Sequence, residues 1–151
     1  MIRSVFSFLF SSILIIAMVT AGRADDQKKP AVCSVCNMKV SEAGKKFSVE
    51  LPNVSGMGPA SFCDIGCALI SRNSECATRQ STFDSNAIVY DLMTGEQVPA
   101  EKAFFAYKSS FRTPMGYGIV AFKDKAEAEK FAAEHGKAKV VRWFELVDMK
   151  L

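Results

Sequence analysis

The sequence predicts an α+β fold, with a small, mostly antiparallel sheet and short helices. Segments with the alternation or β-branched content of strands outnumber helical segments. The connections between segments are short, which favours one layered domain. The order strand, strand, helix, strand occurs once in each half of the chain. Two similar β-β-α-β halves are compatible with this order, although we see no residue-level repeat in the sequence alone.

The first half begins with a predicted strand at 47–51, where apolar and polar residues alternate. A loop with two glycines follows, and then a short strand at 60–63. Asp64 suits the N-cap position of a helix over 65–72. Few apolar residues occur in 73–85, which predicts an exposed connection.

The second half contains the clearest helix of the chain. Asp124 is the predicted N-cap, Glu127 stands three residues later as in a capping box, and Gly136 ends the helix. A single helical turn is expected at 101–103. The strands expected after the first half are 87–90, 98–100, 104–107, 118–122 and 140–147.

Composition bounds the function. A chain of 151 residues with 49% hydrophobic and 23% charged residues suits one globular domain. The formal charge is only +3 and there is no basic stripe, so nucleic acid is not an expected partner. His135 is the single histidine, which excludes a two-histidine zinc site. We find no Ser-His-Asp set, phosphate loop or convincing carboxylate pair, so we expect no enzyme.

The N-terminal residues 1–24 have the parts of a secretory signal peptide. Arg3 supplies the positive charge, 5–21 is an apolar run, and small residues precede the expected cleavage site after Ala24. A membrane is an expected partner only if this leader stays uncleaved, because the run is at the lower length limit for a span. We expect an exported, periplasmic protein whose mature domain is 25–151.

Three sulfur donors lie close together in Cys33-x-x-Cys36-x-Met38, just after the leader. Thiolate and thioether donors together favour a soft ion, above all Cu(I). A c-type haem is excluded because Asn37 stands where histidine is required. A structural disulfide stays open as an alternative in an oxidising compartment. A redox pair also stays open, although the motif does not follow a thioredoxin pattern.

Two further cysteines, Cys63 and Cys67, are spaced as C-x3-C. Cys67 falls in the first turn of the predicted helix, where the helix end favours a thiolate. With Cys33 and Cys36 they could close a four-thiolate zinc site, and packing thiols or a disulfide are equal alternatives. Cys76 lies in the polar connection and is the candidate for the unpaired thiol of an odd set of five.

Methionine in loops offers further soft donors. Met115 stands in a Pro-Met-Gly turn, where it has no helix or strand face to fill, so it is a candidate Cu(I) ligand as well as a candidate packing residue. Met57, between two glycines, has the same character. Met93 stands in a turn without a specific role, and a structural role is expected for His135 at a helix end.

With these residues in view, the chain resembles the NosL family, accessory proteins of nitrous oxide reductase maturation that bind Cu(I) in the periplasm. The resemblance covers residues 31–147. The segments that carry it are Cys33-x-x-Cys36-x-Met38, Phe62-Cys63-Asp64-Ile65-Gly66-Cys67, Tyr90-Asp91 with Gly95, Ala100-Glu101-Lys102-Ala103 and Pro114-Met115-Gly116-Tyr117-Gly118.

The resemblance implies two similar β-β-α-β halves and a Cu(I) site. The residues it assigns to the metal are Cys33, Cys36, Met38 and Met115, with Cys63 and Cys67 as further candidates in this chain. The family usually has glycine at position 37 and aspartate at position 63, so Asn37 and Cys63 are departures.

The function expected from the residues and the resemblance is that of a periplasmic Cu(I) chaperone. It would bind one copper ion and pass it by ligand exchange to a cuproenzyme, of which nitrous oxide reductase is one candidate, or to another carrier. The alternative is an exported interaction module with structural zinc or disulfide staples. An enzyme would be a thiol-disulfide oxidoreductase, and the missing thioredoxin pattern argues against it.

Overall fold

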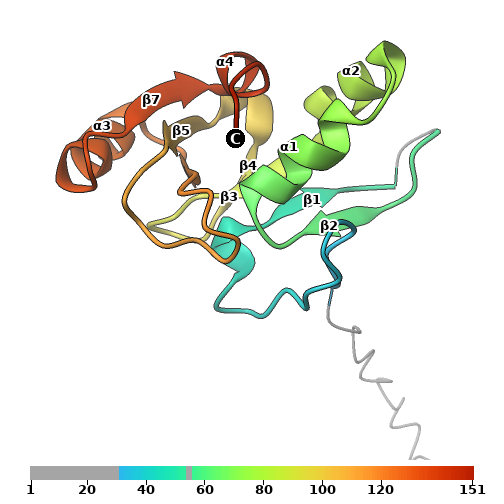
Figure 1. The fold of residues 1–151 in the computed structure, drawn as a ribbon, viewed down its shortest axis with the longest axis horizontal. Helices are drawn as coiled ribbons and strands as arrows, with labels where there is room; N and C mark the ends of the chain where they lie inside the picture. Colours follow the sequence, from blue (N-terminus) through green and yellow to red (C-terminus); the bar gives the residue numbers. More distant parts are fainter. Residues whose placement is uncertain (1–30, 54–55) are drawn as a thin grey trace, which may run out of the picture.

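Two antiparallel sheets form the frame of the protein (Figure 1). The computed structural model describes residues 31–53 and 56–151. The predicted signal peptide, its cleavage after Ala24 and the polar stretch 25–30 lie outside the described residues. No helix in the described ranges has the length and apolar content that crossing a membrane requires.

The first sheet has four strands, with β1 (Val49–Leu51) and β3 (Ile88–Tyr90) at its centre. Helices α1 (Ile65–Asn73) and α2 (Ala77–Asn86) connect its second strand to its third. A single turn of 3-10 helix, η1 (Lys45–Phe47), precedes it. In spatial order, β2-β1-β3-β4, the strands are Ala60–Phe62, Val49–Leu51, Ile88–Tyr90 and Gln97–Pro99.

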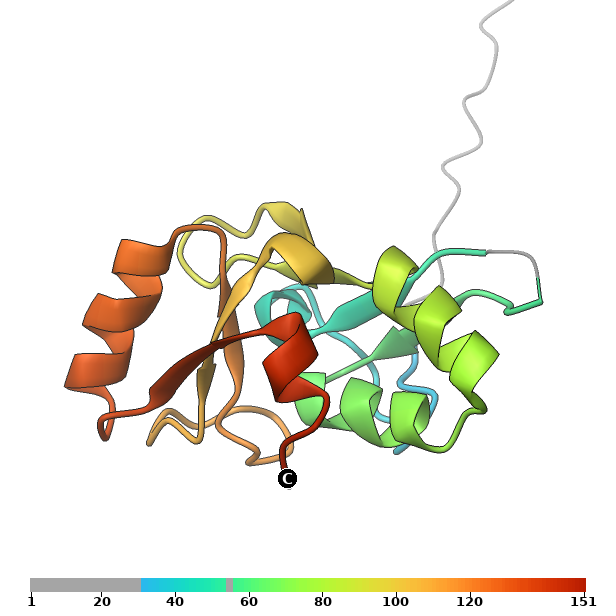
Figure 2. The ribbon, with the colours of Figure 1, turned by 90° about the horizontal axis from the view of Figure 1, so that it is seen from above.

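The second sheet has three strands around β5. The 3-10 turn η2 (Ala100–Lys102) leads into it, α3 (Lys125–Glu134) connects β6 to β7, and the short α4 (Trp143–Leu146) ends the chain. In spatial order, β6-β5-β7, the strands are Val120–Phe122, Phe104–Tyr107 and Lys139–Arg142. In Figure 2, α3 lies at one end of the molecule, α1 and α2 lie at the other, and α4 lies between them.

The two halves share one topology, which confirms the α+β class and the predicted β-β-α-β plan. In each half the first strand is central, the second and third flank it, and all pairs are antiparallel. The structure also reveals a residue-level match that the sequence alone did not show. Phe62 ends β2 and Asp64 caps α1, just as Phe122 ends β6 and Asp124 caps α3.

One hydrophobic core joins the two halves. Trp143 is fully buried and packs against Phe105, with ring centroids 5.6 Å apart, and the same cluster includes Val49 and Phe62 of the first sheet. A smaller cluster lies beneath α3. The Asp91 carboxylate, in the turn after β3, accepts a hydrogen bond from the Lys123 amide (2.7 Å), so a side chain of the first half also binds the backbone of the second.

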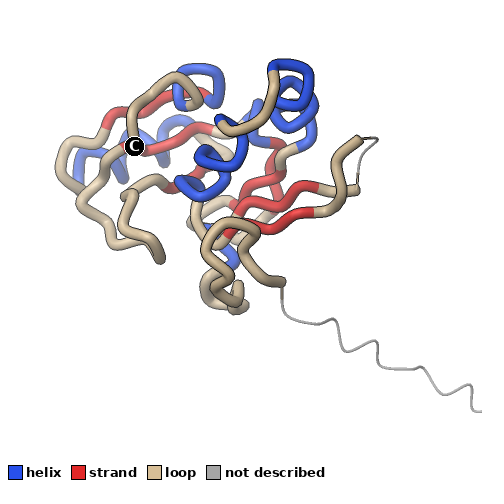
Figure 3. Tube along the Cα trace, turned by 45° about the vertical axis from the view of Figure 1, so that its right-hand side comes forward, coloured by secondary structure: helices blue, strands red, loops and turns tan. Residues whose placement is uncertain are grey.

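Several strands are shorter than the sequence predicts, and loops take up much of the chain between them (Figure 3). Phe47 belongs to η1, not to the first strand, which starts at Val49. The predicted final strand, 140–147, ends at Arg142. Trp143 starts α4 because the Glu145 carboxylate accepts from the Arg142 amide (2.9 Å) and closes a helical turn.

The predicted exposed connection 73–85 is indeed largely exposed, but the expectation of a simple connection is wrong, because most of it is α2. The helical pattern of apolar residues is weak because only Phe83 of this helix is buried. The centroid of its ring lies 5.7 Å from that of Phe62. Tertiary contacts stabilise the helix instead. Asp84 accepts two hydrogen bonds from Arg72 of α1 (2.9 and 2.7 Å) and one from the Trp143 indole (2.9 Å). A helix that depends on partners far along the chain leaves little periodic signal in its own residues.

Candidate metal centre

Four cysteine sulfurs converge at one place in the first half. The Sγ atoms of Cys33, Cys36, Cys63 and Cys67 all lie within 4.8 Å of one another. Those of Cys36 and Cys63 are 3.4 Å apart. Cys33, Cys63 and Cys67 are buried and Cys36 is half-buried. The two cysteine pairs therefore form one cluster, which was one of the alternatives that their spacing allowed.

The loop that carries Cys33 and Cys36 closes on itself and attaches to β2. The Cys33 amide donates to Met38 O (2.8 Å), and the Asn37 amide donates to Cys33 O (2.9 Å). Asn37 has φ +59°, a left-handed conformation that asparagine and glycine adopt more easily than other residues. The Ser34 amide donates to Ser61 O (2.8 Å), which brings the loop beside the end of β2.

The strand-to-helix junction supplies the other two thiols. Cys63 directly follows β2, and Cys67 lies in the first turn of α1. Asp64 caps this helix as predicted, since its carboxylate accepts from the Gly66 amide at 3.0 Å. The cap fixes the direction in which α1 leaves the strand, so both thiols face the Cys33–Cys36 loop.

Burial and mutual contact set the protonation of the cluster. Burial raises the pKa of Cys33, but hydrogen bonds to its sulfur have the larger, opposite effect and lower the pKa to about 7. The donors are the amides of Cys36, Cys63 and Val35 and the thiol of Cys36. Burial and contacts with neighbouring cysteines raise the pKa of Cys63. Burial and the charge on Cys33 raise that of Cys67 to about 12. The thiolate predicted at Cys67 is therefore wrong, because these effects exceed that of the helix end.

The cluster fits a thiophilic metal ion. Four sulfurs at a metal–sulfur distance of about 2.3 Å in a tetrahedron would lie about 3.8 Å apart, and no two sulfurs here are more than 4.8 Å apart. A small contraction therefore brings all four within bonding distance of one ion. Such an ion would displace the protons that Cys63 and Cys67 hold, as metal binding to thiols generally does.

The two candidate methionine donors lie on loops that adjoin the cluster. Met38 is 44% exposed and follows Cys36 in the same loop. Met115 is 38% exposed, and its amide donates to Asp64 Oδ2 at 3.0 Å. The Pro-Met-Gly loop of the second half therefore contacts the residue between Cys63 and the first turn of α1. Sequence reasoning found the cap but missed this second bond of Asp64.

The remaining candidates lie elsewhere. Met57 is 7% exposed and belongs to the hydrophobic core. The prediction that it is a loop donor like Met115 is therefore wrong. Met93 is 64% exposed in the turn after β3. Cys76 is exposed at the N-cap of α2 and is not one of the four clustered thiols. His135 stacks on Phe131, with centroids 3.9 Å apart, which fits the structural role expected for it.

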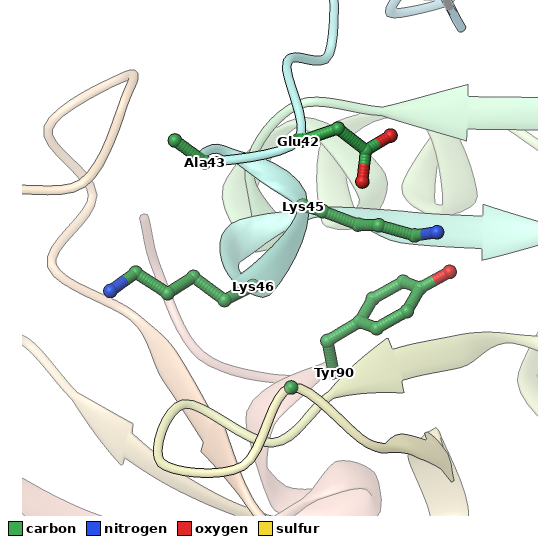
Figure 4. Close-up of a pocket in the computed structure, with 6 residues that line it drawn as sticks. Glu42, Ala43, Lys45, Lys46 and Tyr90 are labelled. Carbon is green, nitrogen blue, oxygen red and sulfur yellow. The ribbon is translucent and has the colours of Figure 1, made fainter.

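A pocket of about 510 Å³ lies beside η1 (Figure 4). The Lys45 ammonium lies 5.2 Å from the centroid of the Tyr90 ring across it. Burial raises the pKa of Tyr90 to about 12, so this phenol stays protonated at neutral pH. The residues that line the pocket, none of which carries sulfur, are Glu42, Ala43, Lys45, Lys46, Tyr90 and Gly95.

Comparison with known proteins agrees with the fold. None of the curated proteins matches the chain. The crystal structure of the copper chaperone NosL from Shewanella denitrificans superposes with a TM-score of 0.58 at 22% identity, covering 76% of this chain and 87% of that one. At this identity the match shows a shared fold. The family model of NosL matches residues 26–150, nearly all of the chain after the predicted leader. The protein therefore belongs to the NosL family.

Proposed function

We propose that this protein is an exported, non-enzymatic chaperone that binds Cu(I) and delivers it to a copper-accepting partner. The partner is a periplasmic cuproenzyme or another copper carrier. Nitrous oxide reductase is the first client to test, because the NosL resemblance points to its maturation. The proposal combines family membership with the donor set of this chain.

The observation that carries the proposal is the convergence of four thiols, with the exposed Met38 and Met115 on loops whose backbones contact the thiol-bearing segments. Thiolate and thioether ligands select Cu(I) over the harder divalent ions. The ligands we propose are Cys33, Cys36, Cys63, Cys67, Met38 and Met115. Cu(I) binds two to four soft donors, so this set exceeds what a single ion needs, and exchange among the donors is easy.

Access to the site supports delivery rather than permanent storage. Cys36 is half-buried, whereas Cys33, Cys63 and Cys67 are buried. A donor from an acceptor protein would therefore approach on the side of Cys36. Transfer would proceed by ligand exchange, in which the incoming sulfur or nitrogen binds the copper before the last chaperone sulfur leaves. No bond of the protein itself is broken.

An anaerobic titration of the reduced mature protein with Cu(I), against a chelator of known affinity, tests the proposal. We expect binding that a Cys33→Ser variant weakens at least tenfold and that a Cys76→Ser control leaves unchanged, since Cys76 is outside the cluster. Met115→Ala should weaken Cu(I) binding and Met93→Ala should not. Equal affinities in the wild type and in Cys33→Ser would refute the ligand assignment.

A second candidate function is structural. Four close thiols, three of them buried, also match the closed four-cysteine zinc sites that stabilise small folds. On this alternative the module would be an exported interaction domain with a zinc or disulfide staple. Zinc removal would then unfold the domain. Cys33→Ser would lower its melting temperature and leave its Cu(I) affinity unchanged. Unchanged melting after metal removal would exclude this role.

A further inference from the structure

Asp64 makes two hydrogen bonds, one through each carboxylate oxygen. Its side chain is fully buried between Cys63 and the first turn of α1. Oδ1 accepts from the Gly66 amide of its own helix, and Oδ2 accepts from the Met115 amide, each at 3.0 Å. A single carboxylate thus holds both the junction that carries two thiols and the loop that carries a thioether, although the loop is 51 residues away.

The second half of the protein shows that helix capping does not require this arrangement. Asp124 occupies the equivalent place after β6 and accepts from the Ala126 and Glu127 amides, 2.7 and 3.3 Å away. Both of its bonds stay within its own helix. Asp64 makes one such bond and directs its other oxygen to Met115. The capping role is common to the two halves, and the link to a distant loop is specific to the half with the thiols.

The loop 113–118, which Asp64 binds through Met115, is also held by hydrogen bonds between its own residues. The Gly116 amide donates to Thr113 O (3.0 Å), and the Gly118 amide donates to Thr113 Oγ1 (3.2 Å). Tyr117 packs against Gly66 so closely that a Cβ added at Gly66 would lie 2.1 Å from the ring. The backbone position of Met115 is therefore fixed from inside the loop and from the face of α1.

We propose that Asp64 is a positioning residue that holds the Met115 thioether beside the thiol cluster and so sets the preference for Cu(I) over Zn(II). This inference rests on the proposed function. Thiolates bind both ions, whereas a thioether is a much better ligand for Cu(I). Loss of the hydrogen bond between Asp64 and the Met115 amide should therefore lower the affinity for Cu(I) and leave the affinity for Zn(II) unchanged.

The test compares Asp64→Asn with the matched control Asp124→Asn. Asparagine is a good N-cap, but an NH₂ group replaces one of the two carboxylate oxygens, and that group donates and cannot accept. Asparagine therefore cannot accept from both the Gly66 and the Met115 amides, which bind different oxygens of Asp64. We expect Asp64→Asn to lower Cu(I) affinity about tenfold or more, as for other residues that orient metal ligands, with Zn(II) affinity unchanged. Asp124→Asn should change neither. In the metal-free protein, labelled at methionine nitrogen, the Met115 amide should exchange with solvent faster only in Asp64→Asn.

Three results would overturn the inference. The first is an equal loss of Cu(I) and Zn(II) affinity, which is the sign of a damaged helix end. The second is full additivity of Asp64→Asn and Met115→Ala, because residues that act through one contact do not add. The third is an unchanged exchange rate of the Met115 amide. If Asp64→Asn does not fold, Asp64→Ser, another good cap with one oxygen, replaces it.

Failure of the proposed function would look different. In that case the wild-type protein itself would show no Cu(I) binding in the competition titration, while the amide exchange of Met115 would still respond to Asp64→Asn. The two experiments therefore separate an error about the metal from an error about the positioning of the loop.

Discussion

The Sγ atoms of Cys36 and Cys63 lie 3.4 Å apart, although 27 residues separate them in the chain. The contact forms because the loop containing Cys36 pairs with Ser61 just before Cys63. Two thiols this close are donors for one metal ion when reduced and partners for a disulfide when oxidised.

We expect oxidised glutathione to convert Cys36 and Cys63 of the metal-free protein into a disulfide. Two electrons and two protons pass to the glutathione disulfide, which leaves as two thiols, and the cluster loses two donors. Peptide mapping and thiol counts in a Cys76→Ser background check this, with Cu(I) affinity measured before and after reduction. A Cys33–Cys36 bond as the main product would contradict the expectation. The Cu(I)-loaded protein should resist oxidation, since its thiolates are bound.

Gly66→Ala tests the contact between α1 and Tyr117. Alanine in a helix is normally more stable than glycine by about 1 kcal/mol, but here the new methyl would meet the Tyr117 ring at 2.1 Å. We expect a net loss of about 1–3 kcal/mol in the free energy of unfolding, the usual cost of overpacking. In a Tyr117→Ala background the same substitution should become stabilising. Urea denaturation of the reduced, metal-free protein measures both, and stabilisation in both backgrounds would disprove the close contact.

Asp84→Ala tests the tertiary origin of α2. The substitution removes an ion pair with Arg72 and the acceptor of the buried Trp143 indole. We expect unfolding free energy to fall by about 2–4 kcal/mol, because a largely buried cation and an indole N–H lose their partner. Glu96→Gln is the control, since its ion pair with Lys123 is exposed and should contribute less than about 1 kcal/mol. Equal effects of the two variants in urea would contradict this account.

Asp91→Asn tests the pH dependence of the link between the halves. Burial raises the pKa of Asp91, but hydrogen bonds from Lys123, Thr94 and Met93 outweigh it and hold the pKa below its ordinary value of 3.8. A lowered pKa in the folded state gives stability that is present above pH 3.8 and is lost as the pH falls through the folded value. At pH 7 the variant should be less stable by about 1–3 kcal/mol.

Below pH 3.8 this difference should shrink, because the wild-type carboxyl becomes protonated and loses the same contribution. The measurement is the urea midpoint of both proteins from pH 7 to pH 3, in the metal-free state. Other carboxyl groups titrate in both proteins and cancel in the comparison. A difference that stays constant across this range would show that Asp91 has an ordinary pKa.

The sequence predicted what depends on local pattern. Asp64 and Asp124 were identified as helix caps because an N-cap is a short-range signal, and both cap their helices in the structure. The class of the fold followed from short alternating strands. By contrast α2 was missed, since Asp84 acquires its role from Arg72 and Trp143. The final strand was overextended because the apolar residues after Arg142 suit a strand and a buried helical turn equally.

The candidate site was predicted only as one of several alternatives. Spacing allowed Cys33, Cys36, Cys63 and Cys67 to share one site, but packing thiols or disulfides fitted the same spacing. The pairing of the first loop with Ser61 is what brings the two pairs together. The state of Cys67 was predicted from the helix end alone, while its pKa depends on burial and on the distant Cys33. The hydrogen bond from the Met115 amide to the Asp64 carboxylate joins the two halves, and no sequence pattern in either segment predicts it.

The repeated frame of the two halves has a practical consequence. Cys63 and Lys123 occupy the same place, one residue after a strand-ending phenylalanine and one before a capping aspartate. The strand-to-helix junction has the same form with a thiol at this position as with an ammonium group. The chemistry at each junction therefore depends on a side chain that the fold itself does not require. The second half can therefore serve as an internal reference for folding when the metal preference of the first half is redesigned.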